Sequence, residues 1–520
     1  MKHYSISILL VLLMSMACNK TFAYDIAVAN ADGKTIYYNY TNDGLELQVT
    51  SGSYQTGTYS GDVVIPETVT YMNRTRKVTS IGSAFDACPS LTSVTIPNTV
   101  KSIGTFCYCS KLKKLIIPNS VTSDIFLNQF TNINHLDTLV IGDGIKSIAD
   151  KAFQYTTIGT LVIGKGIKTI STYAFKDCSI EKVVVKDLAA WCSINFGYGE
   201  NYPYADDYYN YSNPLYKTGS LYLLDDIETE IIDLIIPQSV KSISDGAFFG
   251  IKRITSVTIP NSVETIGKYS FGMSGLTSVT IPNSVTSIGK GVFWGCKDLI
   301  SATLSNNITS IEESAFQGCT GLTSMIIPNS VTAIDSQAFY GCSGLTSVTI
   351  GSGVTSIGKS AFWGCFGLTS VTIPNSVTAI DSQAFSSSGL TSVTIGSGVT
   401  SIGKSAFYGN KIAIVISKIE TPFAINGKSS SYPIFSTDTF MNADLFVPVG
   451  TIDKYKTTEG WKDFIWITEG IPSGIEGVKT DDDKTEVSRY TLDGKKLSEP
   501  QKGINIIKMN DGTTRKEIVK

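Results

Sequence analysis

Few residues in this sequence are suited to acid–base or nucleophilic chemistry. It contains two histidines, and because His3 lies in a segment that we expect to be removed, a Ser/His/Asp triad would have to use His135. Acidic residues recur near one phase of a repeat, at Glu312, Glu313, Asp335 and Asp381. Paired carboxylates hydrolyse glycosidic bonds when both line one cleft, whereas a regular repeat offers no deep cleft. We therefore expect a lone surface histidine, a solvated acidic row and no enzyme activity.

Motifs for cofactors and metal ions are missing from the sequence. It has no GxxxxGK[ST] phosphate loop, no HExxH zinc motif and no CxxC pair, so no cofactor-binding or metal-binding residue is predicted. Four of its ten cysteines recur at intervals of 23 residues: Cys296, Cys319, Cys342 and Cys365. A residue type that recurs at one phase occupies the same place in every repeat, and free cysteine behaves as a small buried hydrophobe. The spacing predicts a row of buried thiols, with poor geometry for disulfides between neighbours.

Aromatic residues form two groups that are candidate ligand contacts. One group follows a repeated phenylalanine: Phe249, Trp294, Tyr340, Trp363 and Tyr408. The other lies in a stretch without the repeat: Tyr202, Tyr204, Tyr208, Tyr209 and Tyr211. Aromatic side chains supply contact area at low entropic cost, which favours a recognition surface. The alternative is that the first group packs between repeats and the second against their flank.

These residues are carried by a repeat of about 23 residues. Its phenylalanines fall 22 or 23 residues apart, at Phe248, Phe271, Phe293, Phe316, Phe339, Phe362, Phe385 and Phe407. In one unit, Val279 and Ile281 alternate with Ser278 and Thr280, a period of two that predicts a strand with one buried face. Hydrophobic residues then return on the opposite side, and Ala-Phe closes the coil as a helical turn. One unit cannot bury its own apolar edge, so the sequence predicts a β-rich solenoid of stacked coils.

The general form of the repeat, LxxVxIPxxVxxIxxxAFxxC, resembles the BspA-type leucine-rich repeat family of bacterial surface proteins. The resemblance runs from roughly Val78 to Val415, about two thirds of the chain. It implies the leucine-rich repeat class and adhesion at a bacterial surface, with host or microbial surface proteins or glycans as partners.

The N-terminus reads as an export signal over residues 1–23. A short charged start precedes an apolar run from Ile6 to Met16, which is too short to span a bilayer. Small residues at Thr21 and Ala23 favour cleavage before Tyr24. An alternative is a lipobox ending at Cys18, which would become lipidated, although Ser15 stands where Leu is usual. Either route places the protein outside the cell or on its outer surface, with a lipid anchor as its one route to a membrane.

The chain divides into a series of expected segments. These are a β-rich N-terminal cap over 24–76, the solenoid over 77–415 with an aromatic insertion at 187–220, a C-terminal capping unit over 416–469, a linker over 470–486 and a small β module over 487–520. The last module is similar to C-terminal sorting tails of Bacteroidetes. The alternative is a stabilising pack of β-hairpins, for which Asn510-Asp511-Gly512 supplies a turn.

Composition narrows the function further. Charged residues make up 17 % of the chain and the net charge is −3, so a disordered chain and a nucleic-acid-binding face are both excluded. We expect a monomeric, exported, adhesin-like protein that presents an extended surface to protein or glycan partners. The alternatives are a structural surface array built on rows of Ser and Thr, such as Ser278 with Thr280, and a polysaccharide-processing factor.

Overall fold

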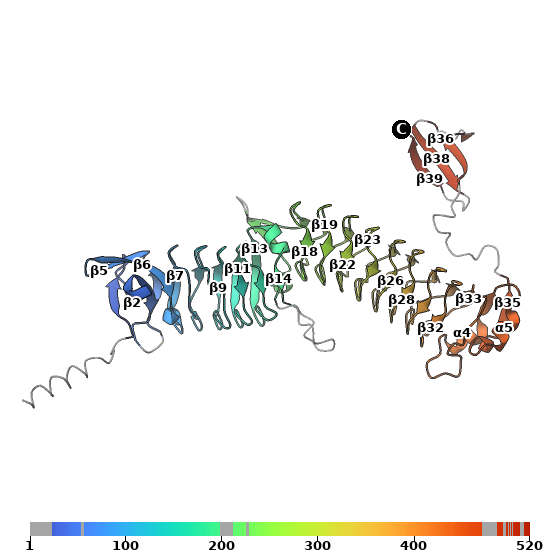
Figure 1. The fold of residues 1–520 in the computed structure, drawn as a ribbon, viewed down its shortest axis with the longest axis horizontal. Helices are drawn as coiled ribbons and strands as arrows, with labels where there is room; N and C mark the ends of the chain where they lie inside the picture. Colours follow the sequence, from blue (N-terminus) through green and yellow to red (C-terminus); the bar gives the residue numbers. More distant parts are fainter. Residues whose placement is uncertain are drawn as a thin grey trace, which may run out of the picture.

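The computed structural model describes residues 23–53, 57–197, 212–224, 228–470 and the C-terminal stretches 486–491, 496–497, 499, 501, 503–509 and 514–519. Its repeats stack as coils along an elongated rod, as the sequence predicts (Figure 1). Residues 1–22, which hold most of the expected export signal, lie outside the described residues. None of the described helices is long and apolar enough to cross a membrane.

The coil over residues 276–293 shows how one repeat folds. Val279 is 4 % exposed, while its neighbours Ser278 and Thr280 face solvent, which confirms the expected strand with one buried face. The chain turns and enters a second short strand, where Ile288 is 2 % exposed. Phe293, fully buried, then fills the space between the two strands. This coil therefore contributes one strand to each of two ladders and one ring to the core.

The coil closes through turns, and the helical turn expected around Ala-Phe forms as a 3-10 turn at η2 (Ser83–Phe85) but not in the coil of Phe339. In the coil of Phe339, the residues two before and two after the ring, Gln337 and Gly341, have φ values of 59° and 69°. Left-handed residues end a helix, so two of them so close together leave no room for one. The same pair recurs in other coils, at Gly291 with Gly295, Ser314 with Gly318, Ser360 with Gly364, and Ser405 with Gly409.

The first ladder runs almost the whole length of the rod in parallel register. Its N-terminal part is one sheet of β4 (Gly61–Val64), β7 (Leu91–Thr95), β8 (Lys114–Ile116), β9 (Leu136–Val140), β11 (Thr157–Ile163), β13 (Ser179–Val185) and β15 (Leu221–Leu224), with β16 (Glu228–Glu230) antiparallel to β15. It continues with β17 (Asp233–Ile235), β19 (Ser256–Thr258), β21 (Ser278–Thr280), β23 (Ser301–Thr303), β25 (Ser324–Ile326), β27 (Ser347–Thr349), β29 (Ser370–Thr372), β31 (Ser392–Ile395) and β33 (Ile414–Ser417).

The second ladder is built from two-residue strands in three sheets, with breaks after Phe196 and after Ile288. The first of these breaks is called the interruption. Before the interruption it contains β10 (Ser147–Ile148), β12 (Thr169–Ile170) and β14 (Asn195–Phe196). After it come β18 (Ser242–Ile243), β20 (Thr265–Ile266), β22 (Ser287–Ile288), β24 (Ser310–Ile311), β26 (Ala333–Ile334), β28 (Ser356–Ile357), β30 (Ala379–Ile380) and β32 (Ser401–Ile402). The interruption coincides with the expected insertion, whose ends fold as α2 (Leu188–Cys192) and α3 (Leu215–Thr218).

Stacked phenylalanine rings run through the core, in one series from Phe85 to Phe175 and in a second from Phe248 to Phe435. Together they are called the column. Phe316, Phe339 and Phe362 show the geometry, with ring centroids 5.3 Å and 5.0 Å apart and interplanar angles of 4° and 8°. The column ends in rings that meet it at an angle. Tyr59 is tilted by 45° against the first phenylalanine, Phe85, at one end, and Phe464 packs edge-on against Phe435 at the other. Both caps thus close the core with an aromatic side chain.

Each cap is built on its own secondary structure. The N-terminal cap is a sheet of β1 (Ile26–Ala29), β2 (Thr35–Thr41), β3 (Glu46–Thr50), β6 (Arg74–Ile81) and β5 (Thr68–Tyr71), with 3-10 turns η1 (Asn42–Gly44) and η2 (Ser83–Phe85). β4 precedes the boundary expected at residue 76 and already pairs with the solenoid strand β7. The C-terminal cap has α4 (Thr437–Asn442), β34 (Asp444–Val447), α5 (Ile452–Thr457), η3 (Trp461–Asp463) and β35 (Trp466–Glu469), and its two strands extend the first ladder.

The C-terminal β module is present as a four-stranded sheet. Its strands are β37 (Lys496–Leu497), β36 (Glu486–Thr491), β38 (Gly503–Met509) and β39 (Thr514–Val519), paired in that order. β38 and β39 are antiparallel, as the predicted hairpin requires, while its turn residues lie outside the described part of the chain.

Candidate functional site

The aromatic residues that follow the core phenylalanines lie at the turn edge of the coils. Tyr340 and Trp363 stack on each other with centroids 4.5 Å apart and an interplanar angle of 15°, and both are partly exposed. Tyr408 is 47 % exposed, and Trp294 is partly exposed. The structure therefore brings Tyr340 and Trp363 together as one aromatic pair. We call Trp294, Tyr340, Trp363 and Tyr408 the aromatic row.

Phe249 differs from these residues because it is fully buried. Its ring lies between Tyr216 of α3, 6.0 Å away, and Trp294, 6.4 Å away and nearly parallel at 10°. The intervening coil carries Gly272 at this position, where an added Cβ would come within 2.9 Å of the Phe249 ring. Phe249 is thus a packing residue and offers no surface to a ligand.

The edge beside the aromatic row is open. Gly341 follows Tyr340, and a Cβ added there would meet no heavy atom within 4 Å. Gly341 is required by its φ of 69° and not by crowding. Phe366 lies close by, 64 % exposed, with its ring 4.0 Å from the Cβ position of Gly364. Exposed aromatic rings beside a low backbone edge form a surface on which a partner can make flat contact.

The strand face of the first ladder carries the predicted rows of hydroxyl groups. Exposed Ser and Thr pairs occur on four strands of this ladder: Ser278 with Thr280, Ser301 with Thr303, Ser347 with Thr349, and Ser370 with Thr372. Between the second and third of these, β25 carries exposed Ile326 in place of the threonine. Other threonines, at the coil corners, are used internally. Thr355 donates both its backbone N–H (2.8 Å) and its hydroxyl (3.0 Å) to the carbonyl of Thr332, one coil earlier. Corner threonines therefore join coils, and the strand hydroxyls remain at the surface.

The buried thiols of Cys296, Cys319, Cys342 and Cys365, which we call the cysteine row, do more than fill space. Cys342 Sγ donates to the Phe316 carbonyl at 3.0 Å, and Cys319 and Cys365 repeat this bond to the phenylalanine of their preceding coils. Where cysteine is replaced, Ser388 and Asn410 donate the same bond, at 2.7 Å each. The sequence prediction treated these thiols as hydrophobes and missed this role, although Ser388 and Asn410 at the same phase are also hydrogen-bond donors.

Burial keeps these thiols protonated. Removal from water raises the pKa of Cys296 to about 11 and that of Cys365 to about 12, and it raises the pKa values of Cys319 and Cys342 well above the usual value. Nucleophilic chemistry needs a thiolate, so the row is inert. Among the described residues, no group of His, Cys, Asp and Glu is placed to hold a metal ion.

The residues considered for acid–base chemistry lie at the surface of separate coils. His135 Nε2 is 3.0 Å from Asp137 Oδ1, and both side chains are partly exposed. The pKa of Asp335 is raised by partial burial and by the neighbouring carboxylates of Glu312 and Glu313. None of these acids lines the cavity described next. Cys18 and the tyrosines of the insertion lie outside the described residues: Tyr202, Tyr204, Tyr208, Tyr209 and Tyr211.

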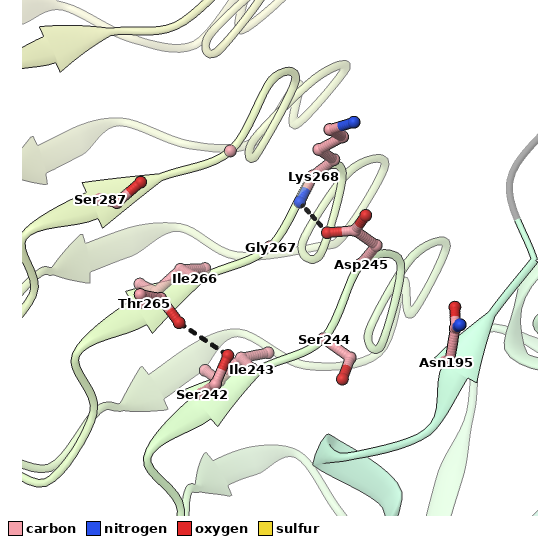
Figure 2. A pocket seen from close by; sticks show the side chains of 11 residues that line it. Asn195, Ser242, Ile243, Ser244, Asp245, Thr265, Ile266, Gly267, Lys268 and Ser287 are labelled. Carbon is pink, nitrogen blue, oxygen red and sulfur yellow. Dashed lines mark hydrogen bonds between the residues drawn. The ribbon is translucent and has the colours of Figure 1, made fainter. Parts of the chain in front are cut away.

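A cavity of about 380 Å³ opens where the second ladder is interrupted. Figure 2 shows its floor, made by hydroxyl-bearing side chains of Ser242, Thr265 and Ser287, with Asn195 of β14 on the far side. Thr265 donates to Ser242 at 2.7 Å, and the Lys268 backbone N–H donates to Asp245 Oδ1 at 2.7 Å. Sequence reasoning did not anticipate this cavity, because it depends on which strands fail to pair.

Comparison with known proteins supports the architecture. The model of the BspA type leucine-rich repeat region matches six copies, over residues 63–188, 227–336 and 309–423. A leucine-rich repeat protein from Bacteroides ovatus is 27 % identical with a TM-score of 0.56, over 76 % of this chain and 94 % of its own. One from Eubacterium ventriosum is 21 % identical with a TM-score of 0.41, over 70 % of this chain and 95 % of its own. A leucine-rich cell surface protein from Faecalibacterium prausnitzii is 23 % identical with a TM-score of 0.30, over 66 % and 94 %. No curated protein matches the sequence.

Proposed function

Because the chain belongs to the BspA-type leucine-rich repeat family, we propose that it is an exported, adhesin-like protein that binds protein or glycan partners through the edge of its solenoid. It acts outside the cell or on the outer surface, as a monomer. The family consists of structural or binding proteins and not of enzymes, which agrees with a surface role.

The aromatic row is the observation that carries this proposal. Binding hot spots are enriched in Trp and Tyr, which add large contact areas with few rotatable bonds. Tyr340 and Trp363 are already stacked in the free protein, so a partner does not have to order them on binding. The open backbone edge at Gly341 gives a partner access to both rings.

A binding assay with the full chain tests the proposal. The purified protein is passed over immobilised extracellular matrix proteins and a glycan array, and its best partner is compared with the Tyr340→Ala/Trp363→Ala variant. Loss of a hot-spot pair is expected to raise Kd by about tenfold or more. The control is Tyr108→Ala/Tyr155→Ala, which removes two tyrosines of the N-terminal half, each 60 % exposed, and is expected to leave Kd unchanged. Equal losses in both variants, or no binding to either panel, would refute the proposal.

Export is proposed separately and has its own test. A mass spectrum of the mature protein from its native host would begin at Tyr24 if the export signal is cleaved there, or at a lipid-modified Cys18 if the lipobox is used. A mature protein that retains Met1 would rule out both routes.

A structural surface array is the second candidate, and the hydroxyl rows of the strand face favour it. Pairs such as Ser347 with Thr349 repeat from coil to coil at the spacing of neighbouring strands, about 4.8 Å, and so form a flat, regular and uncharged face. Light scattering separates the two functions. Concentration-dependent assembly of the purified chain would support an array, whereas a monodisperse monomer supports the binding protein.

A further inference from the structure

The cavity at the interruption results from a coil that contributes to one ladder only. β15 pairs in parallel with β13, so the first ladder receives a strand from this coil. Within the described residues, the coil supplies no strand to the second ladder, and β14 and β18 belong to separate sheets. The cavity therefore occupies the place where one short strand is missing.

Hydrogen bonds from buried side chains hold the boundary between β14 and β18 in place. On the turn side, Trp191 Nε1 donates to the Ala247 carbonyl at 2.8 Å, and Asn213 Nδ2 donates to the carbonyls of Gly246 and Ala247 at 2.6 Å and 3.0 Å. All these groups are buried, and they replace the backbone N–H groups that a complete coil would supply. The Ser244 N–H donates to the Cys192 carbonyl at 2.9 Å and joins the two halves. The cavity walls are therefore fixed without any bound ligand.

The lining mixes polar and apolar groups, its charges balance, and it contains no aromatic side chain. Hydroxyl groups come from four residues and an amide from a fifth: Ser242, Ser244, Thr265, Ser287 and Asn195. The two charged residues, Asp245 and Lys268, have opposite signs. Added Cβ atoms at Gly267 and Gly289 would come within 2.5 Å and 2.4 Å of backbone nitrogens. Close packing therefore allows only glycine at both positions.

We propose that this cavity binds a short, neutral saccharide. Hydroxyl, amide and carboxylate groups can each pair with sugar hydroxyls, which both donate and accept hydrogen bonds. The balanced charge gives no preference for an anion or a cation, and the apolar part of the lining can contact the C–H groups of a sugar ring. A volume of about 380 Å³ lies near the lower end of the range for small-molecule sites, which fits a short saccharide and not a protein surface. The site shares no residue with the aromatic row, so a failed test of one proposal does not refute the other.

Isothermal titration of the full chain tests this site. The probes are N-acetylglucosamine, galactose, lactose and cellobiose, each alone, with glucose 6-phosphate as a charged comparison. At least one neutral sugar is expected to bind with a Kd below about 10 mM. Asn195→Ala/Thr265→Val removes an amide and a hydroxyl from the cavity and is expected to raise that Kd by about tenfold or more.

Two controls make the result specific. Ser401→Ala removes an exposed hydroxyl at the equivalent position of β32, where no cavity exists, and Tyr340→Ala/Trp363→Ala removes the aromatic pair; neither is expected to change sugar binding. Unfolding curves check that each variant is folded. The proposal is overturned if no neutral sugar binds, if the cavity variant binds as well as the wild type, or if glucose 6-phosphate binds more tightly than every neutral sugar.

Discussion

Replacing Cys342 by serine and by alanine separates two roles of the cysteine row. If the thiol is a hydrogen-bond donor to the Phe316 carbonyl, serine keeps the bond and alanine loses it. If the thiol is only an apolar filler, serine is the worse replacement, because it buries a hydroxyl where alanine buries a methyl group. The coil that carries Ser388 at this phase already uses a hydroxyl for the same bond, at 2.7 Å. We therefore expect stability to fall in the order wild type, serine, alanine.

The magnitude follows from the second partner of the same carbonyl. The Phe316 oxygen also accepts from the Cys319 N–H at 3.1 Å, so Cys342→Ala leaves it with one bond and not with none. The loss is then that of one net hydrogen bond, about 0.5–1.5 kcal/mol, and not the larger cost of an unpaired buried group. Removing the sulfur adds about 1 kcal/mol of lost burial and packing. Alanine should cost about 1.5–2.5 kcal/mol, and serine less than about 1 kcal/mol.

Urea unfolding of the full chain gives the order, read as shifts of the midpoint at constant slope. Repeat arrays can unfold in parts, so hydrogen exchange of the peptides around residues 316–342 gives a local measurement beside the global one. Ser388→Ala is the matched control and should cost about as much as Cys342→Ala. A serine variant that is less stable than the alanine variant by more than about 0.5 kcal/mol would refute the donor role.

Three further predictions concern the core, the turns and pH. Phe339→Ala should lower the free energy of unfolding by about 3–5 kcal/mol, because the ring is fully buried. Phe339→Leu should cost less, because leucine fills most of the volume and loses only the ring stacking. Urea unfolding midpoints measure both losses. Gly353→Ala should destabilise the protein more than Gly341→Ala does. A Cβ at position 353 would lie 1.9 Å from a backbone oxygen of the preceding coil, whereas alanine at position 341 suffers only left-handed backbone strain of about 1–2 kcal/mol. Equal losses of stability in thermal melts would contradict this. Burial raises the pKa of Cys296 from 9.0 to about 11. The stability that the protonated thiol contributes is therefore complete below pH 9 and is lost as the pH rises through 11. A variant with serine in place of the cysteines of the row should lose less stability between these pH values than the wild type.

Much of the coil could be predicted because its information is periodic. The alternation of Val279 with Ser278 and Thr280 fixes which face is buried, and the phase of Phe293 places one ring in every coil. The predicted helical turn around Ala-Phe forms at η2 but not in coils such as that of Phe339, and the difference has a local cause. Non-glycine residues such as Ser314 and Gln337 adopt left-handed backbone conformations, which their residue types do not predict.

The parts of the site that escaped prediction depend on contacts between distant segments. Phe249 is buried because Tyr216 reaches it from α3 and because Gly272 leaves space for Trp294, and no spacing rule links these three residues. The cavity lies where β14 and β18 belong to separate sheets, and a residue pattern does not reveal which strands pair. The hydrogen-bonding role of the cysteines was accessible in principle, since Ser388 and Asn410 occupy the same phase and both donate.

The interrupted second ladder also bears on how the rod would respond to tension. A pull along its axis separates coils one after another, so each boundary carries the whole load with its own few bonds. From β17 to β33 every two neighbouring coils share at least one paired backbone ladder. The boundary between β14 and β18 is instead held by the side chains of Trp191 and Asn213 and by the backbone N–H groups of Ser244 and Arg253. Under stretching, rupture should start there and leave two shorter rods, each with one capped end and one newly bared core.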